Sequence, residues 1–199
     1  MKSINNLYKK ANITRERRNQ LNKHRSVVIW ITGLSGSGKS TLAFSLEEEL
    51  YKLECRTYVL DGDNIRRGLS SDLTFTDSDR KENIRRIAEV ANLIVESGVI
   101  AIAALISPFK EDRILARKLL SHDDFIEIYC KASLEVCEAR DVKGLYKLAR
   151  AGKIENYTGI DSPYEAPENP ELVIDTESET IKESVKKVVD ILRSKGIIN

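Results

Sequence analysis

A glycine-rich stretch early in the chain contains the residue types that bind phosphate groups. It follows the pattern G-x-x-x-x-G-K-[ST] and comprises Gly33, Leu34, Ser35, Gly36, Ser37, Gly38, Lys39, Ser40 and Thr41. Glycines allow successive backbone N–H groups to converge on phosphate oxygens, and a helix beginning near Lys39 adds its positive dipole end. Lys39 supplies a charge for the β- and γ-phosphates, and the Ser40 hydroxyl is placed to coordinate Mg²⁺. The stretch predicts a binding site for ATP or GTP.

Two carboxylates and two arginines stand together further along the chain. Asp61 and Asp63 directly follow an apolar run at residues 57–60, and Arg66 and Arg67 come next. One carboxylate can orient an acceptor hydroxyl or hold a metal-bound water, while the arginines neutralise an anionic substrate. These residues indicate an acceptor site for phosphoryl transfer. The structural alternative is a turn with a helix cap, beside solvated arginines.

Three further polar residues stand where a second ligand would lie. Ser107 follows another apolar run, where a serine can bond a substrate, accept a phosphoryl group or cap the next helix, and capping is the commonest of these uses. Arg80 and Asn83 are three residues apart on a predicted helix. Residues at this spacing share one helical face, so both side chains can reach one ligand.

Short apolar strands alternate with amphipathic helices and must position these groups. The pattern predicts strands at 27–32, 57–60, 99–106, 125–129 and 172–174, and helices near 40–53, at 79–97 and from a capping box at 176–179 to Gly196. Strands separated by helices indicate parallel pairing with right-handed crossovers. We therefore predict an α/β protein, with a three-layer α/β/α domain around a mostly parallel five-stranded sheet. The residues that follow the strands would meet at one edge of this sheet.

The distribution of charge and of turn residues suggests how the chain is divided. Residues 1–25 hold eight basic side chains and one acidic one, which leaves −6 for the remainder. We expect a basic N-terminal arm at 1–25, either solvated or in contact with a polyanion, and a single domain at 26–199. Glycines and prolines punctuate residues 152–170, which indicates either a lid-like loop at about 141–167 or a passive surface excursion.

Composition excludes several classes of protein. With 41% hydrophobic and 32% charged residues, the chain is neither disordered nor collagen-like, and its longest apolar run, residues 99–106, is too short to span a bilayer. A net charge of +1 implies no bulk attraction to nucleic acid or membranes. No apolar stretch follows the N-terminal charges, so we expect a cytoplasmic protein. Cys55, Cys130 and Cys137, with only two histidines, favour neither disulfides nor a zinc site.

Six stretches in order resemble the adenylylsulfate kinase (APS kinase) family of P-loop kinases. They are the phosphate-binding loop and residues 60–66, 79–86, 106–109, 143–146 and 157–167. Only the first is common among P-loop proteins at large, and the similarity covers about residues 14–176. The resemblance implies a P-loop NTPase fold and transfer of the γ-phosphate of ATP to the 3′-hydroxyl of adenosine 5′-phosphosulfate (APS), giving PAPS and ADP for sulfate activation. It also implies Mg²⁺ as cofactor, without zinc, flavin or haem, and a homodimer.

The resemblance further implies roles for individual residues. Lys39 and Asp63 would be catalytic, with Asp63 near the acceptor hydroxyl and Asp61 near Mg²⁺ through water. Ser107 matches a serine described as a phosphorylated intermediate in the family. We expect direct transfer instead, because an in-line reaction needs positioning and charge neutralisation rather than a covalent relay. Substrate contacts would come from Arg66, Phe75, Arg80, Asn83, Ile106, Ser107, Lys143, Leu145, Tyr157 and Thr158. Phe75 and Tyr157 would stack on the adenine of APS, and Arg140 would lie near the ATP adenine.

The chain departs from the family pattern at five positions. It has Leu105 for an aromatic residue, Arg67 for His or Gln, Thr74 for Gly, Val142 for Pro and Tyr157 for Phe. Two other functions fit the generic features: a kinase for another small hydroxyl substrate, such as a nucleoside, gluconate or shikimate, and a catalytically silent nucleotide-binding module. The aromatic residues and the 143–146 stretch favour an acceptor that carries adenine. Lys39, Ser40 and Asp63 together favour an active enzyme.

Overall fold

The computed structural model describes residues 12–120 and 122–199, which form a five-stranded parallel sheet. Its strands lie in the order β2-β3-β1-β4-β5, and every neighbouring pair is parallel. Their bounds are β1 Val28–Thr32, β2 Thr57–Asp61, β3 Ile100–Ala104, β4 Phe125–Lys131 and β5 Leu172–Asp175. The prediction of a parallel five-stranded sheet is confirmed, and the predicted strand ends differ by one or two residues from those observed.

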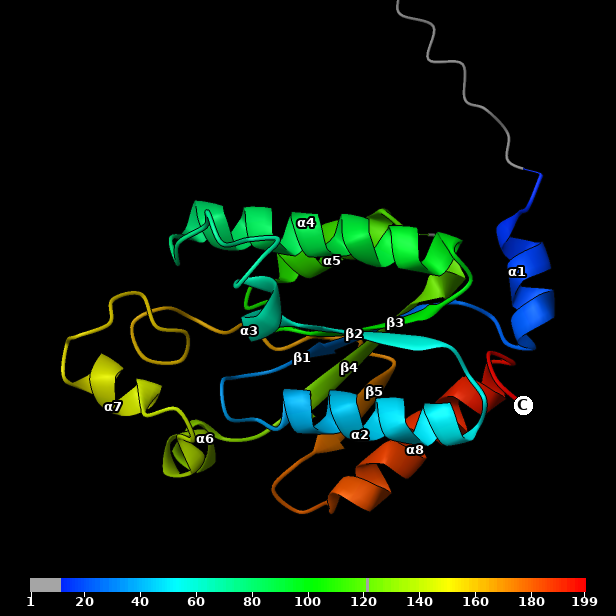
Figure 1. Cartoon of the computed structure of the whole chain (residues 1–199). Helices are drawn as coiled ribbons and strands as arrows, with labels where there is room; N and C mark the ends of the chain where they lie inside the picture. The colour runs from blue at the N-terminus through cyan, green and yellow to red at the C-terminus, as the bar shows by residue number, and fades with distance from the viewer. Residues whose placement is uncertain (1–11, 121) are drawn as a thin grey trace, which may run out of the picture.

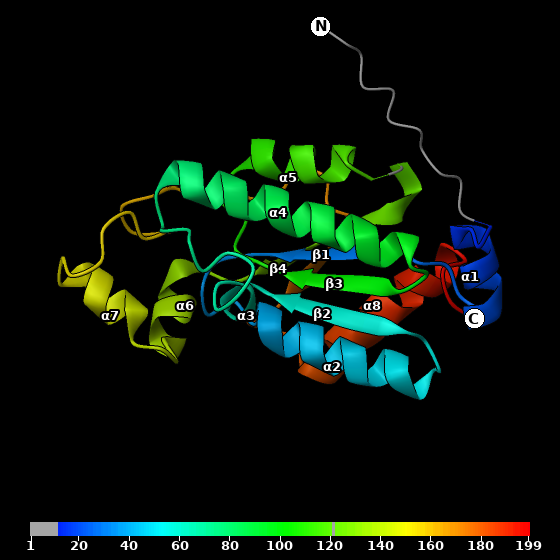
Figure 2. The same cartoon turned by 45° about the horizontal axis from the view of Figure 1, so that its top comes forward.

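Helices cover both faces of the sheet and complete the predicted three layers. Helices α4 and α5 lie on one face, and α2 and α8 on the other (Figure 1). Helices α3, α6 and α7 lie beyond the carboxyl ends of the strands, while α1 lies at the opposite end near the C-terminus (Figure 2). The bounds are α1 Arg15–Asn22, α2 Lys39–Lys52, α3 Gly62–Ile65, α4 Asp77–Glu96, α5 Lys110–Lys118, α6 Leu134–Arg140, α7 Leu145–Arg150 and α8 Ile181–Ser194, with a short 3₁₀ helix at His122–Asp124.

The central strand β1 divides its side chains between two hydrophobic cores. Ile29 and Ile31 pack under α2 and α8, whereas Val28 and Trp30 pack under α4 and α5. All five residues of β1 are buried, which explains why its sequence lacks the polar alternation of a strand with one solvated face. The phosphate-binding stretch follows directly after Thr32, the last residue of β1. Because β1 is fixed on both faces, the stretch begins at a fixed point at the carboxyl end of the central strand.

The described part of the predicted basic arm includes a helix packed on the domain. Arg15 of α1 forms an ion pair with Asp124, and the Asn22 side chain donates a hydrogen bond of 2.8 Å to the carbonyl of Gly98. Residues 1–11 lie outside the described residues, so contact of the arm with a polyanion stays a prediction. Within the described ranges, no helix is long and apolar enough to cross a membrane.

The start of the last helix corrects the sequence prediction. The capping box is formed by Thr180 and Glu183, so residues 176–179 precede helix α8 instead of opening it. Both segments carry the same Thr-x-x-Glu spacing. Thr176 is unsuitable because its backbone N–H donates to the carbonyl of Lys131, which keeps it beside strand β4. Glu179 accepts the backbone N–H of Asp175 and pairs with Lys187.

Replacing Thr180 with alanine should therefore destabilise the protein. Loss of the N-cap hydroxyl is expected to lower the free energy of unfolding by about 1 kcal/mol. The matched control is Ser178→Ala, an exposed position in the rejected capping segment, which should leave it unchanged. Urea unfolding followed by circular dichroism measures both. An equal loss in the two variants would contradict the assignment of the cap.

Candidate active site

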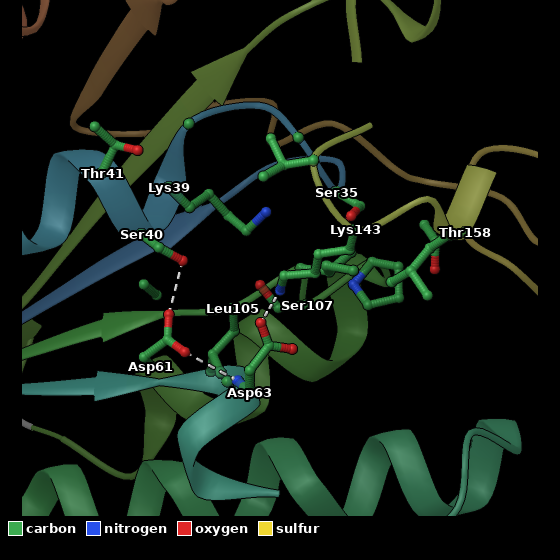
Figure 3. A pocket seen from close by; sticks show the side chains of 18 of the residues that line it. Ser35, Lys39, Ser40, Thr41, Asp61, Asp63, Leu105, Ser107, Lys143 and Thr158 are labelled. Carbon is green, nitrogen blue, oxygen red and sulfur yellow. Dashed lines mark hydrogen bonds and ion pairs between the residues drawn. The ribbon is translucent and has the colours of Figure 1, made fainter. Parts of the chain in front are cut away.

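A cavity of about 630 Å³ opens at the carboxyl ends of the strands. The phosphate-binding loop forms one wall, α3 and the start of α4 form another, and residues from the 140–158 region close over it. Figure 3 shows the Ser40 side chain directed toward Asp61, and Lys143 reaching Asp63 from the other side of the cavity. Side chains from distant parts of the sequence thus converge on one space.

The phosphate-binding loop has a backbone that only glycine accommodates at several points. Gly36 has a φ of +76°, and a Cβ atom there would lie 2.9 Å from the carbonyl oxygen of Cys137. Gly38 has a φ of +92° and forms the N-cap of helix α2, whose positive end therefore points into the cavity. This geometry is that of an anion-binding loop at a helix N-terminus.

Lys39 places a buried ammonium group inside this loop. Its Nζ donates a hydrogen bond of 2.7 Å to the carbonyl of Leu34. Burial lowers the pKa of Lys39 to about 8, an effect opposed by the neighbouring Cys130 and Cys137 side chains and by Asp63, and reinforced by the charge of Lys143. A negatively charged ligand at the loop would favour the charged form, so the group is set up to bind phosphate oxygens.

Asp61 links the phosphate-binding loop to helix α3. Its Oδ2 accepts a hydrogen bond of 2.7 Å from the Ser40 hydroxyl, and its Oδ1 accepts the backbone N–H groups of Asp63 at 3.1 Å and Asn64 at 3.3 Å. The structural interpretation of Asp61 is therefore confirmed, because one oxygen caps the helix, while the functional interpretation stays a prediction, with the other oxygen facing the loop. Ser40 and Asp61 together present two adjacent oxygen donors, which suit a hard cation such as Mg²⁺.

Asp63 is paired across the cavity. Its carboxylate forms an ion pair with Lys143, although both side chains remain more than half exposed, at 59% and 55%. Asp63 comes from the first turn of α3, and Lys143 precedes α7. The pair therefore joins the sheet edge to the segment that closes the cavity.

The residues predicted to hold the acceptor lie at the other end of the cavity. Arg80 donates hydrogen bonds to the Thr158 hydroxyl and to the Asn156 carbonyl. Asn83 is buried, and its Oδ1 has no hydrogen-bond partner among the described residues. The Arg66 guanidinium lies 4.3 Å from the centre of the Phe75 ring, which is 61% exposed. An aromatic face and guanidinium groups suit an anionic nucleotide.

Thr74 organises the loop that carries Phe75. Its backbone N–H donates to Asp79 Oδ2 at 2.8 Å, and its hydroxyl donates to the same oxygen. Arg66 donates to the Thr74 carbonyl at 3.0 Å. Thr74 is absent from the positive-φ residues of the described chain, so this loop does not need the glycine typical of the family. The threonine hydroxyl instead ties the loop to the first turn of α4.

Ser107 does not cap the following helix, which corrects the sequence interpretation. The N-cap of α5 is Phe109. The Ser107 hydroxyl donates to Thr32 Oγ1 at 3.0 Å and accepts from Trp30 Nε1 at 3.1 Å. Its backbone has a φ of +38°, and the Ser107 carbonyl accepts a hydrogen bond of 2.6 Å from Arg113. These contacts turn the chain away from the sheet and leave the hydroxyl engaged on both sides.

Most of the residues predicted for the site line the cavity. The exceptions are Gly33, Leu34 and Ser37, which contribute backbone or packing to the loop, and Arg67, which is exposed and does not line the cavity. Those that line it are Ser35, Gly36, Gly38, Lys39, Ser40, Thr41, Asp61, Asp63, Arg66, Phe75, Arg80, Asn83, Ile106, Ser107, Arg140, Lys143, Leu145, Tyr157 and Thr158.

Sequence reasoning missed two lining residues that contact the loop or its neighbours. Thr176 receives a hydrogen bond of 2.7 Å at its carbonyl from Arg140, which also donates to the Gly36 carbonyl. Tyr146 donates a hydrogen bond of 2.9 Å to the Ser35 carbonyl. Tyr146 ends the recognised 143–146 stretch, so its position was a usable signal, whereas the sequence marked Thr176 only as a helix cap.

Comparison with known proteins gives consistent results. The family model described as adenylylsulphate kinase matches residues 25–175. An adenylyl-sulfate kinase of Acaryochloris marina is 54% identical over all of this chain and 97% of its own length. The structure of a Mycobacterium tuberculosis APS kinase in complex with AMPPNP and APS superposes with a TM-score of 0.82 at 47% identity, covering 85% of this chain and 99% of that one. A hexameric APS kinase from Thiobacillus denitrificans gives a TM-score of 0.68 at 33% identity, over 89% of this chain and 31% of that one.

Nucleotide affinity should fall as the pH rises above 8. Lys39 loses its proton near that pH in the unbound protein, whereas phosphate oxygens raise its pKa in the complex, so binding takes up a proton. With Lys39 at a pKa of about 8, we expect the Kd for an ATP analogue to be about tenfold weaker at pH 9 than at pH 7. Isothermal titration in buffers of different ionisation enthalpy measures the affinity and the proton uptake together.

The control for this titration is Lys39→Arg. Its guanidinium stays charged throughout the range, so its affinity, whatever its absolute value, should not change between pH 7 and 9. A pH-independent Kd in the unmodified protein would rule out Lys39 as the titrating group.

Proposed function

The chain belongs to the adenylylsulphate kinase family, and we propose that it transfers the γ-phosphoryl group of ATP directly to the 3′-hydroxyl of APS beside Asp63. It is an ATP-dependent phosphotransferase whose products are PAPS and ADP. The observation that carries the proposed mechanism is the convergence on one cavity of the phosphate-binding loop, the Asp63–Lys143 pair and the arginines near Phe75. The same convergence argues against the two other functions considered from the sequence, which are a kinase for another small hydroxyl substrate and a catalytically silent nucleotide-binding module.

The donor half of the reaction is assigned to the phosphate-binding loop. Its N–H groups and the Lys39 ammonium bind the β- and γ-phosphates and stabilise the charge that develops on the transferred group. The adjacent oxygens of Ser40 and Asp61 fit Mg²⁺, which when bound neutralises phosphate charge. The described residues hold no group of three or more His, Cys, Asp or Glu side chains suited to a metal ion. We assign Arg140 to the ATP adenine, since it reaches the loop at the Gly36 carbonyl.

The acceptor half is assigned to α3, α4 and the segment over the cavity. Asp63 accepts the proton of the 3′-hydroxyl as that oxygen bonds to the γ-phosphorus, while the bond from the γ-phosphorus to the β-phosphate oxygen breaks and ADP leaves. Arg66, Arg80 and Asn83 hold the phosphosulfate, and the ring faces of Phe75 and Tyr157 contact adenine. The walls are assigned to Ile106, Leu145 and Thr158. Lys143 must leave Asp63 before the hydroxyl approaches.

Direct transfer is favoured over a phosphorylated serine by the surroundings of Ser107. This residue is 2% exposed, and its hydroxyl is held between Trp30 and Thr32. A nucleophilic serine needs an adjacent base to take its proton, and its Oγ hydrogen bonds here go to an indole and a hydroxyl instead of a carboxylate or a histidine. Ser107 therefore acts as a structural support for the acceptor pocket.

The proposal includes the assembly and the location of the protein. We propose a homodimer on the basis of the family resemblance, and a cytoplasmic location on the basis of the sequence composition. A solved relative is described as hexameric, so sedimentation at several protein concentrations is the appropriate measurement of the assembly.

Asp63→Asn and Ser107→Ala should have opposite effects on turnover. Removing the base is expected to lower kcat by about 10²- to 10⁴-fold with little change in the KM for ATP. Ser107→Ala should keep kcat within about tenfold, because transfer does not pass through the serine. The measurement is APS-dependent ADP release, with PAPS identified by chromatography.

Controls for this pair separate chemistry from folding. Reactions without APS, or with AMP or gluconate in its place, report hydrolysis and other acceptors. Asp77→Asn, an exposed carboxylate at the start of α4, should be fully active. Loss of all turnover in a folded Ser107→Ala variant would establish the covalent route, and an active Asp63→Asn variant would remove the proposed base.

Thr74→Val should weaken APS binding selectively. The variant keeps the shape of the side chain but loses the hydroxyl that ties the Phe75 loop to Asp79. We expect the KM for APS to rise by about two- to fivefold, the effect of one exposed hydrogen bond, with kcat and the KM for ATP unchanged. Thr74→Ser should restore the original KM. Equal rises in both KM values would show a general effect on folding.

A further inference from the structure

The side chain of Arg113, on helix α5, is a buried charge that the proposed mechanism does not use. The residue is 3% exposed and does not line the cavity. Its Nε forms an ion pair at 2.9 Å with Glu127 of strand β4, which is also buried. Taking an arginine and a glutamate out of water is costly, and apolar side chains of similar volume often give equal or greater stability. Stability alone therefore does not explain this pair.

The two remaining nitrogens of the Arg113 guanidinium bind segments that are far apart in the sequence. One donates a hydrogen bond of 2.6 Å to the carbonyl of Ser107, in the turn between β3 and α5, and the other donates one of 2.6 Å to the carbonyl of Glu165. Ser107 lines the cavity, and its φ of +38° is uncommon for a residue other than glycine. Glu165 belongs to the stretch that also contains Tyr157 and Thr158, two cavity-lining residues. One buried side chain thus joins two segments that contribute to the cavity wall.

Further hydrogen bonds fix Glu165 at the start of helix α5. Its backbone N–H donates to the carbonyl of Pro108 at 2.9 Å, and its carboxylate accepts the backbone N–H of Lys110 at 2.7 Å. The N-cap residue of α5 makes no side-chain cap, so the carboxylate of Glu165 binds one of the free N–H groups of the first turn. Of the three contacts that hold Glu165 here, only the one from Arg113 also includes the carbonyl of Ser107.

We propose that Arg113 is a positioning residue for the acceptor half of the site, which fixes the Ser107 turn and the Glu165 segment relative to each other. The inference rests on the proposed function, which assigns APS to this part of the cavity. A guanidinium group is planar and holds its donors in a rigid fork, so a single side chain sets the spacing between Glu127 and the two carbonyls. An ammonium group pairs equally well with Glu127 but has no fork with which to hold both carbonyls in this geometry.

The test is Arg113→Lys, which keeps the positive charge beside Glu127 and removes the fork. We expect kcat/KM for APS to fall by about tenfold or more, as for loss of a hydrogen bond from a charged group, and the Kd for AMPPNP with Mg²⁺ to stay within about twofold. Most of the loss should lie in the KM for APS, because the two segments contact the acceptor instead of the transferred group. Steady-state ADP release and isothermal titration with AMPPNP provide these values.

The matched control is Arg117→Lys, one helical turn later on α5. Arg117 also pairs with Glu127, and it pairs with Glu171 and donates to the carbonyl of Phe125, so its contacts lie away from the cavity. This variant should keep kcat/KM for APS within about twofold, whatever its melting temperature. An equal loss in the control, an unchanged kcat/KM for APS in Arg113→Lys, an equal weakening of AMPPNP, or a loss confined to kcat would each overturn the inference.

A second variant, Arg113→Met combined with Glu127→Gln, is measured in case the lysine variant does not fold. It removes both buried charges and keeps the volume of the side chains, so we expect it to fold without the two carbonyl contacts. The same selective loss for APS is expected, and its absence would refute the positioning role. The unmodified protein is assayed in parallel. No APS-dependent ADP release there would refute the proposed function, whereas normal release there and in the variants would refute only the role of Arg113.

Discussion

A buried positive charge, with no acidic partner at hydrogen-bond distance in the described part of the chain, dominates the site. Lys39 is enclosed by the phosphate-binding loop and donates to a backbone carbonyl, and burial lowers its pKa toward neutrality. Such a group destabilises the unbound protein, because the carbonyl offsets only part of the lost hydration. The same feature makes the loop bind anions strongly, since phosphate oxygens restore the charged form. Stability lost at Lys39 is thus available as binding energy for the triphosphate, and the sheet and its two cores must hold the loop in this conformation.

The parallel sheet meets that requirement through the central strand. Strand β1 lies between β3 and β4, and both of its faces are buried, so the loop that follows Thr32 begins from a fixed position. The approach of Gly36 to Cys137 then fixes the loop against α6. Asp61, at the end of β2, reaches the loop through Ser40. The end of β1, the end of β2 and helix α6 are far apart in the sequence, and all three contact the phosphate-binding loop. The cavity therefore forms at this edge of the sheet.

The sequence was sufficient for the fold and for most of the residues that line the cavity, and insufficient for the contacts among them. Apolar strands alternating with helices predicted the parallel sheet, and the glycine and lysine pattern predicted the loop, because both depend on local composition and spacing. The capping box was misplaced because two segments carry the same spacing, and only pairing of Thr176 with strand β4 separates them. Ser107 was misjudged for a similar reason, since its partners Trp30 and Thr32 are distant in sequence. Properties set by long-range packing have no local signal.

The residues around the cavity contact one another in ways that the reaction must reverse. Lys143 pairs with Asp63, Arg80 binds the 156–158 segment, and Arg66 lies over Phe75, so groups assigned to substrates are engaged with protein partners. The Lys143–Asp63 ion pair is exposed and contributes little, because both charges are well solvated when apart. Exchanging it for substrate contacts therefore costs little. The buried groups behave differently: Lys39 and Asn83 gain most from a ligand, so the affinity of the site depends on its buried polar atoms more than on its exposed charges.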